Sequence, residues 1–287
     1  MLPVKTPQIL PDEATFSQRF ASGYSQLVWT SVPADLDTPV SAMLRLMQND
    51  APCFLLESVE KGEIRGRYSV IGLMPDLIWR AHGNTSEICH NDRMDAAHCE
   101  PCEGDALDAF RKLYENSKID IPPELPPMAA GLVGFMGYDM VKLMEKLPDT
   151  KPDPIGIPDA CFLRPKIMVI FDAVTDKIFI TTTLWADGKR TDAKSAYAAA
   201  KQRIQHVLDR LSAPLPTPGH QVHHSVKMDD FKSNTPRADY NAMIDSAKEH
   251  IKAGDIFQVV LSQRFSMSFG LPPFALYRSL FFIFARE

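Results

Sequence analysis

The stretch KIMVIFDAVTDKIFITT, residues 166–182, constrains the fold more than any other part of the chain. Two apolar runs flank a polar step at Thr175-Asp176, a pattern typical of two antiparallel strands joined by a tight turn. Other strand patterns also lie between turn-rich connections, and they include RYSVIGL, DLIWRAHG and EICHN. Because helical patterns alternate with these strands, we predict an α+β fold with mainly antiparallel sheets and packed helices, and not a doubly wound parallel sheet.

Helix-forming patterns occur at several places, with apolar side chains three or four residues apart. Start and stop signals bound two of them: Thr38 precedes Pro39 as an N-cap, and Gly254 follows the last helix as a C-cap. After that helix, the run from Ile256 to Phe265 alternates apolar and polar residues and predicts a strand with one hydrated face. A short N-terminal helix is expected around Phe16 and Phe20, which lie four residues apart. Further helices are expected within residues 38–48, 105–114, 192–211 and 236–253.

The stretch GLVGFMGYD places Gly131, Gly134 and Gly137 three residues apart. It matches neither the dinucleotide-binding pattern nor the phosphate-binding loop, since no Lys-Ser/Thr pair follows. We therefore interpret these glycines as positions where a strand lies close to a neighbouring backbone and then turns. A helix over YDMVKLMEKL, ending before Pro148, is expected next.

Net charge and hydropathy limit the partners and the compartment. The 287 residues carry 31 Lys and Arg against 36 Asp and Glu, a formal net charge of −5. We see no broad basic stripe, so nucleic acid and anionic membrane are not expected partners. The first twenty residues lack the apolar core of a signal peptide, and no apolar run approaches the roughly 18 residues of a membrane span. A cytoplasmic protein is the expectation.

Cysteine and histidine gather in one region, at Cys89-His90 and at residues 98–102, HCEPC. Four thiolate and imidazole ligands would suit zinc. However, no second CxxC is present, and the region reads as a polar connection between a strand and a helix. We favour a variable loop in which the thiols are incidental and reduced, as is usual in the cytoplasm.

The stretch LLESVEKGEIRGRYSVIG is the most specific in the chain. Its Glu57 and Ser58 follow a strand, so that a carboxylate could pair with an ammonium group and a hydroxyl could bind a small polar ligand. Arg67 is a candidate partner for a carboxylate, and an amino acid would suit all three residues. The alternative is a strand end followed by a solvated hairpin, and the pattern alone favours that alternative.

Four stretches, taken in order, resemble the large subunit of anthranilate synthase, component I. They are LLESVEKGEIRGRYSVIG, GLVGFMGYDMVKLMEKLP, PDACFLRPKIMVIFD and YNAMIDSAKEHIKAGDIFQVVLSQRF. The resemblance implies that family's N-terminal domain in residues 12–165, completed by a hairpin and a helix in 166–212. A linker rich in proline and histidine is expected at 213–229. Residues 230–287 then resemble the start of the family's chorismate-binding domain.

The resemblance implies an activity and its regulation. The family forms anthranilate and pyruvate from chorismate, with Mg²⁺ and with ammonia that a partner glutamine amidotransferase subunit, component II, releases from glutamine. This is the first committed step of tryptophan biosynthesis, and tryptophan inhibits it. The inhibitor site includes the serine of the Leu-Leu-Glu-Ser motif, here Ser58, with Glu57 and Arg67 as further candidates.

The last residues depart from the family pattern after Leu280, where the chain reads FFIFARE. In the family, the catalytic residues and the Mg²⁺-binding glutamates lie further on, so we expect a truncated chain that is inactive alone. Two alternatives remain open from the sequence. One is component I of aminodeoxychorismate synthase, which acts on chorismate in folate synthesis. The other is a fragment without catalytic activity that binds tryptophan or the glutamine amidotransferase subunit.

Overall fold

The computed structural model describes residues 7–48, 51–58, 66–90, 98–148, 152–186, 192–216 and 226–284. The chain divides into two compact units, Met1–Pro216 and Thr217–Glu287. The expected linker at 213–229 lies partly outside the described residues, as does the end of the chain from residue 285 onward. Within the described ranges, each helix is too short or too polar to cross a bilayer.

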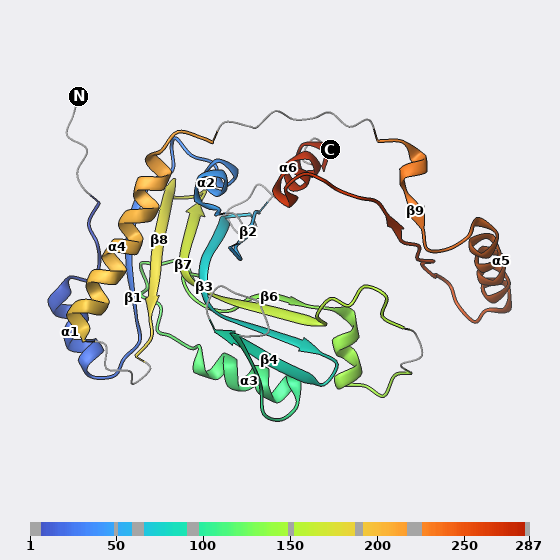
Figure 1. Ribbon diagram of the computed structural model, residues 1–287, viewed down its shortest axis with the longest axis horizontal. Helices are drawn as coiled ribbons and strands as arrows, with labels where there is room; N and C mark the ends of the chain where they lie inside the picture. Colours follow the sequence, from blue (N-terminus) through green and yellow to red (C-terminus); the bar gives the residue numbers. More distant parts are fainter. Residues whose placement is uncertain are drawn as a thin grey trace. The chain divides into compact units, whose positions relative to one another are not determined.

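An eight-stranded antiparallel sheet forms the first unit (Figure 1). β2 pairs with β3 and β6 pairs with β7, while the other strands follow the order β1-β8-β7-β3-β4-β5. The strands are β1 (Gln26–Pro33), β2 (Phe54–Leu56), β3 (Tyr68–His82), β4 (Thr85–His90), β5 (Cys99–Pro101), β6 (Val133–Met136), β7 (Ala160–Asp172) and β8 (Lys177–Leu184). With the helices packed on this sheet, the structure confirms the predicted α+β class and the hairpin that turns at Thr175-Asp176.

Two long strands, β3 and β7, run through the whole sheet (Figure 1). The first half of β3 pairs with β2 and the second half with β4, while β7 pairs first with β6 and then with β8. The register between β3 and β7 shifts between Pro75 and Leu77, next to Met74 with its positive φ of 52°. Such a bulge bends a strand. The sheet therefore curls here, and the two strands expected at RYSVIGL and DLIWRAHG are one bent strand.

Three helices pack on the half of the sheet that contains β1 and β8 (Figure 1). They are α1 (Glu13–Ala21), α2 (Pro39–Leu46) and α4 (Ala193–Ser212), and each starts at a side chain that caps its free N–H groups, respectively Asp12, Thr38 and Asp192. α3 (Ala106–Asn116) packs on the other half, in a core cluster with the fully buried Trp79. Both halves thus bury apolar surface against helices.

The second unit differs from the sequence prediction. Its helix α5 (Arg237–Ala253) ends at Gly254 with a φ of 80°, as the C-cap pattern predicts, and α6 (Pro273–Phe284) follows. The strand expected over Ile256–Phe265 is wrong: only β10 (Phe265–Ser266) forms, paired with β9 (Lys232–Ser233). An isolated apolar run gains no ladder hydrogen bonds, and the described part of this unit offers Ile256 and its neighbours no partner strand.

A second difference concerns the segment after β6. Residues Tyr138–Leu143 form a 3₁₀ helix, where the pattern predicts a longer α-helix up to Pro148. The interpretation of the preceding glycines as positions of close backbone approach is confirmed for Gly134 and Gly137, whereas a Cβ at Gly131 would meet no atom within 4 Å. A Cβ at Gly134 would lie 1.9 Å from the Cys161 carbonyl oxygen of β7, and one at Gly137 would lie 2.9 Å from the Asp159 carbonyl oxygen.

An ion pair connects the residue that precedes β3 to the last residue of β7. Arg67 donates from two nitrogens to the two oxygens of Asp172, at 2.8 and 2.7 Å. Asp172 is buried and also accepts from the Val174 N–H and the Thr175 hydroxyl. The hydrogen bonds from Arg67 lower the pKa of Asp172 from 3.8 to about 2, against the opposing effect of burial.

We predict that Asp172→Asn destabilises the protein at pH 7 and that the loss shrinks in acid. A carboxyl with a lowered pKa stabilises the fold above its unfolded value of 3.8, and this contribution disappears as the pH falls to about 2. The lowering corresponds to about 2 kcal/mol, and solvent around the one-third-exposed Arg67 reduces it to about 1 kcal/mol. Urea unfolding at pH 7, 4 and 2.5 measures it.

The matched control is Asp108→Asn, which removes an exposed ion pair with Arg111 and is expected to change the free energy of unfolding by less than about 0.5 kcal/mol. An Asp172→Asn protein as stable as the wild type at pH 7 would contradict the assigned role of the pair.

The close approach of β6 to β7 gives a second prediction. Gly134→Ala places a methyl group against the backbone of Cys161, which cannot move without breaking the strand pairing, so we expect a loss of about 2 kcal/mol. Thermal unfolding and amide exchange of β6 and β7 measure it. Gly270→Ala is the control, because its Cβ meets no atom within 4 Å. Equal stability of both variants would refute the packing argument.

Candidate functional site

Ser58 lies two residues beyond the end of β2, where this strand leaves β3. Its hydroxyl donates to the Tyr68 carbonyl oxygen at 2.8 Å, and its backbone N–H donates to the Ser69 hydroxyl at 3.4 Å. Ser58 is exposed and Glu57 is half-buried. Since the single hydroxyl hydrogen is used, the Ser58 oxygen remains an acceptor for a ligand at a fixed position.

The structure adds Ser69, which sequence reasoning did not single out. β2 pairs with β3 through Leu56 and Val70, so the next residues of the two segments also face each other. This register brings Ser69 beside Ser58 across the connection at 59–65, which lies outside the described residues. Only the register of β2 against β3 could have indicated the contact of Ser69 with Ser58. The sequence does not determine that register when a long connection joins the two strands.

Arg67 lies next to this pair but already has a partner. Its guanidinium is held by Asp172 and lies 4.8 Å from the centre of the Tyr68 ring. The Arg67 carbonyl also accepts from the Ala173 N–H at 3.0 Å. The hydrogen bond to Asp172 raises the pKa of Arg67. The structure therefore brings Arg67 and Ser58 together at the start of β3. The guanidinium of Arg67 is already paired with a carboxylate of the protein, that of Asp172.

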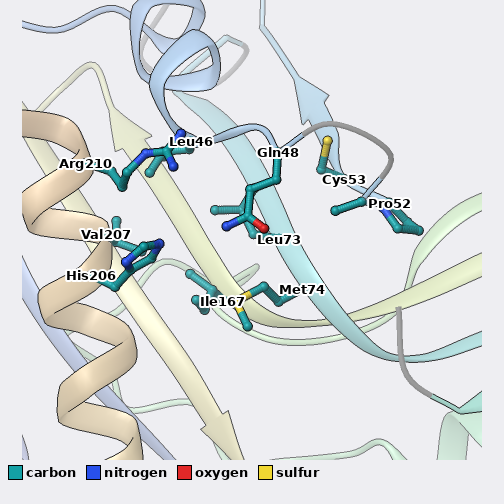
Figure 2. A pocket seen from close by; sticks show the side chains of 11 residues that line it. Leu46, Gln48, Pro52, Cys53, Leu73, Met74, Ile167, His206, Val207 and Arg210 are labelled. Atoms are coloured by element: carbon teal, nitrogen blue, oxygen red, sulfur yellow. The ribbon is translucent and has the colours of Figure 1, made fainter. Parts of the chain in front are cut away.

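A pocket lies near the start of β2, at the opposite end from Ser58 (Figure 2). It has about 400 Å³ of empty space, including its open mouth. Its walls are mostly apolar and come from α2, α4 and the bulged part of β3, with Leu46, Leu73, Ile167 and Val207 among them. Figure 2 shows His206 and Arg210 of α4 across the pocket from Cys53.

The polar groups of this pocket do not form a catalytic set. The Arg210 guanidinium donates to the Arg45 carbonyl oxygen, from Nε at 2.7 Å and from a second nitrogen. Burial raises the pKa of the Cys53 thiol, which disfavours the nucleophilic thiolate. Neither group is therefore prepared for chemistry, and the pocket offers mainly apolar contact.

The prediction that the thiols are incidental and reduced is wrong for two of them. Cys89 and Cys99 form a disulfide between β4 and β5, where the register places them directly opposite, with Cα atoms 3.8 Å apart. Their ten-residue separation gave no sign of this pairing in the sequence. Cys53, Cys102 and Cys161 are free. The described residues contain no cluster of three or more His, Cys, Asp or Glu that fits a metal ion such as Mg²⁺ or zinc.

Known proteins match most of the chain. A family model described as chorismate binding enzyme matches residues 51–282. Anthranilate synthase component 1 of Cereibacter sphaeroides is 44% identical over 266 residues, which cover 93% of this chain and 53% of that protein. The protein of the same name from Synechocystis sp. is 35% identical over 280 residues, covering 95% of this chain and 54% of the relative.

The fold has a solved counterpart. The crystal structure of anthranilate synthase component I from Streptococcus pneumoniae matches with a TM-score of 0.60 and 27% sequence identity, covering 88% of this chain and 52% of that chain. The chain thus spans about half the length of the relatives it matches. The family match includes β2, Ser58, the curled sheet from β3 onward and the helices of the second unit. The chain belongs to the family of chorismate binding enzymes.

Proposed function

We propose that this chain belongs to an anthranilate synthase component I, which forms anthranilate and pyruvate from chorismate in tryptophan biosynthesis. The observation that carries the proposal is the 44% identity over 266 residues to a protein of that name. The Streptococcus pneumoniae structure supports the same assignment, because its match extends over 88% of this chain.

The proposal includes a cofactor, a partner and a place of action. Mg²⁺ is the cofactor that the family resemblance implies. Ammonia would come from glutamine through a glutamine amidotransferase subunit, and the word component in the relatives' name supports an enzyme of more than one component. We place the reaction in the cytoplasm, because the sequence shows no signal-peptide pattern.

We also propose roles for the parts of the chain. Residues 12–165, completed by 166–212, act as the regulatory N-terminal domain, and residues 230–287 begin the chorismate-binding domain, with 213–229 as the linker. The boundary between the two compact units follows Pro216 in the sequence and so lies within the proposed linker, which supports this division.

Ser58 is the proposed contact for the inhibitor tryptophan. Its oxygen is an acceptor held by Tyr68 and Ser69, and Glu57 beside it is a candidate partner for the ammonium group of the amino acid. Arg67 then has an indirect role. Its ion pair with Asp172 fixes the position of the adjacent Tyr68, whose carbonyl oxygen accepts the hydrogen bond from the Ser58 hydroxyl. We favour this positioning role for Arg67 over a direct contact with the carboxylate of the ligand.

We predict no anthranilate from the 287-residue chain incubated with chorismate, Mg²⁺ and ammonium. The reaction requires an acid–base pair and bound metal. This chain matches only about half the length of its relatives, and the family resemblance places those groups in the other half. A chimera of residues 1–280 with the matching remainder of the Cereibacter sphaeroides relative is expected to form anthranilate, detected by its fluorescence.

The remainder alone and the intact relative are the controls. Turnover by the isolated chain would contradict the prediction. An inactive chimera beside an active relative would count against the proposed function, and aminodeoxychorismate as the product would favour the folate-pathway alternative.

A regulatory prediction uses the same chimera. Ser58→Ala is expected to raise the tryptophan concentration for half-inhibition about tenfold, because one hydrogen bond to a ligand is worth about 1.5 kcal/mol. The rate without tryptophan should stay within about twofold, since Ser58 is not a reacting group. Ser22→Ala is the matched control: Ser22 is exposed and its hydroxyl also donates to a carbonyl oxygen, that of Gln18. An unchanged response to tryptophan in Ser58→Ala would exclude the assigned contact.

A further inference from the structure

A cleft at the outer edge of β1 gathers charged side chains around an apolar wall. Its empty space is about 680 Å³, a volume that includes the open solvent at its mouth. The lining comes from α1, the start of β1 and the segment 120–124. Its lining includes Leu10, Arg19, Leu27, Trp29, Asp120 and Glu124.

The cleft is separate from the proposed tryptophan contact. β1 is the end strand of the main sheet path, and β8 and β7 lie between it and β3, to which β2 is paired (Figure 1). The pocket of Figure 2 is lined by other residues, from α2, α4, β3 and β7. No residue lines both the cleft and that pocket. The inference therefore does not rest on the proposed function.

The apolar wall is built by side chains on one face of β1. Leu27 and Trp29 are two residues apart, so both point to the same face. Leu27 is buried in the core, whereas Trp29 is half-buried and its ring packs 6.3 Å from that of Phe179. Packing against Phe179 thus fixes the Trp29 ring on its core side, while its remaining surface lines the cleft beside Leu10.

The free edge of β1 adds backbone groups to this wall. Trp29 exchanges two hydrogen bonds with Leu10, at 2.8 and 2.7 Å, so its N–H and C=O point away from β8. By the two-residue repeat of a strand, Leu27 directs its own N–H and C=O to the same edge. Asp12, two residues after Leu10, instead caps α1. In the described part of the chain, no other backbone group bonds to Leu27 at this edge.

Three ionisable side chains line the cleft without pairing. Arg19 lies on α1, and Asp120 and Glu124 lie on the segment 120–124. All three are exposed, and none forms an ion pair or a side-chain hydrogen bond with any residue in the described ranges. A cation and two carboxylates that face one space but remain more than 4 Å apart can be bridged by a ligand that carries both charges.

We propose that this cleft binds a free α-amino acid with an apolar side chain. The guanidinium of Arg19 receives the ligand carboxylate, for which its planar donors are suited. Asp120 or Glu124 receives the ammonium group, and the apolar side chain lies against Trp29 and Leu10. Because the charged groups are exposed and screened by solvent, the expected dissociation constant is about 1 mM.

The experiment is a titration of the full chain with L-leucine at low ionic strength, followed by tryptophan fluorescence. Trp29 lines the cleft, whereas Trp79 is fully buried and the Trp185 ring lies against Arg164 outside the cleft. The response should therefore be lost in Trp29→Phe. Two matched probes lack one charge each: 4-methylpentanoate has no ammonium group and 3-methylbutylamine has no carboxylate. A saturable response to L-leucine, at least about tenfold stronger than to either probe, is expected because each probe loses one charged hydrogen bond.

Charge variants assign the groups. Arg19→Gln should weaken L-leucine binding about tenfold and leave the weak response to 3-methylbutylamine unchanged, since that probe has no carboxylate to lose. The double variant Asp120→Asn/Glu124→Gln should weaken L-leucine and spare 4-methylpentanoate. Arg111→Gln, an exposed arginine on α3 outside the cleft, is the control and should change nothing.

The outcomes that would overturn the proposal are specific. They are a linear, unsaturable response of the wild type to L-leucine, equal binding of the two probes and L-leucine, or unchanged binding in Arg19→Gln. Circular dichroism of each variant checks the fold. The three side chains are exposed and form no ion pair or side-chain hydrogen bond within the described residues, so the variants are expected to fold. Loss of tryptophan inhibition in the Ser58→Ala chimera would leave this result unaffected, because the residues of the two sites differ.

Discussion

The pairing of β3 with β7 is the constraint on which the first unit depends. Their register extends from Tyr68 opposite Asp172 to Ala81 opposite Ala160, and every other strand of the sheet is attached to one of the two directly or through a neighbour. Both strands contribute side chains to the two core clusters, one on each half of the sheet, so each strand must bend between them. The register shift near Pro75, opposite Pro165, supplies the bend that sends one half towards α4 and the other towards α3 (Figure 1).

The position of Ser58 follows from this pairing. β2 contributes only three paired residues, so it cannot fix its own end. The start of β3 is fixed instead by Arg67, which is bonded to Asp172 through its side chain and to Ala173 through its carbonyl oxygen. Ser58 then takes its place from Tyr68 and Ser69. Two hydrogen bonds thus connect the exposed Ser58 to the start of β3.

Local patterns predicted the elements well, because their causes are local. The caps at Thr38 and Gly254, the turn at Thr175-Asp176 and the close approach at Gly134 depend on a few neighbouring residues. Features that depend on register or on distant partners were not predictable in the same way. The disulfide of Cys89 and Cys99 and the contact of Ser69 require a register. The run from Ile256 has the pattern of a strand but no partner strand in the described part of its unit.

Near a suspected site, the structure shows which charged residues already have a partner within the protein. Several half-buried arginines of the first unit form ion pairs within the protein: Arg164 pairs with Asp76, Arg45 with Asp37 and Arg67 with Asp172. A charge removed from water needs such a partner, and removing one member leaves the other uncompensated. Half-buried arginines are therefore poor candidates for ligand contacts, even beside a specific motif.

Charges that remain available for a ligand lie where water can solvate them, and the sequence does not mark them. Arg19 is an unremarkable residue in the last turn of α1, and Asp120 and Glu124 belong to an irregular segment. The fold gives them significance by placing all three around the edge of β1, beside an indole held by the core. Convergence of unpaired groups on an apolar wall is a property of the tertiary structure, and at such positions the structure extends what a sequence can indicate about binding.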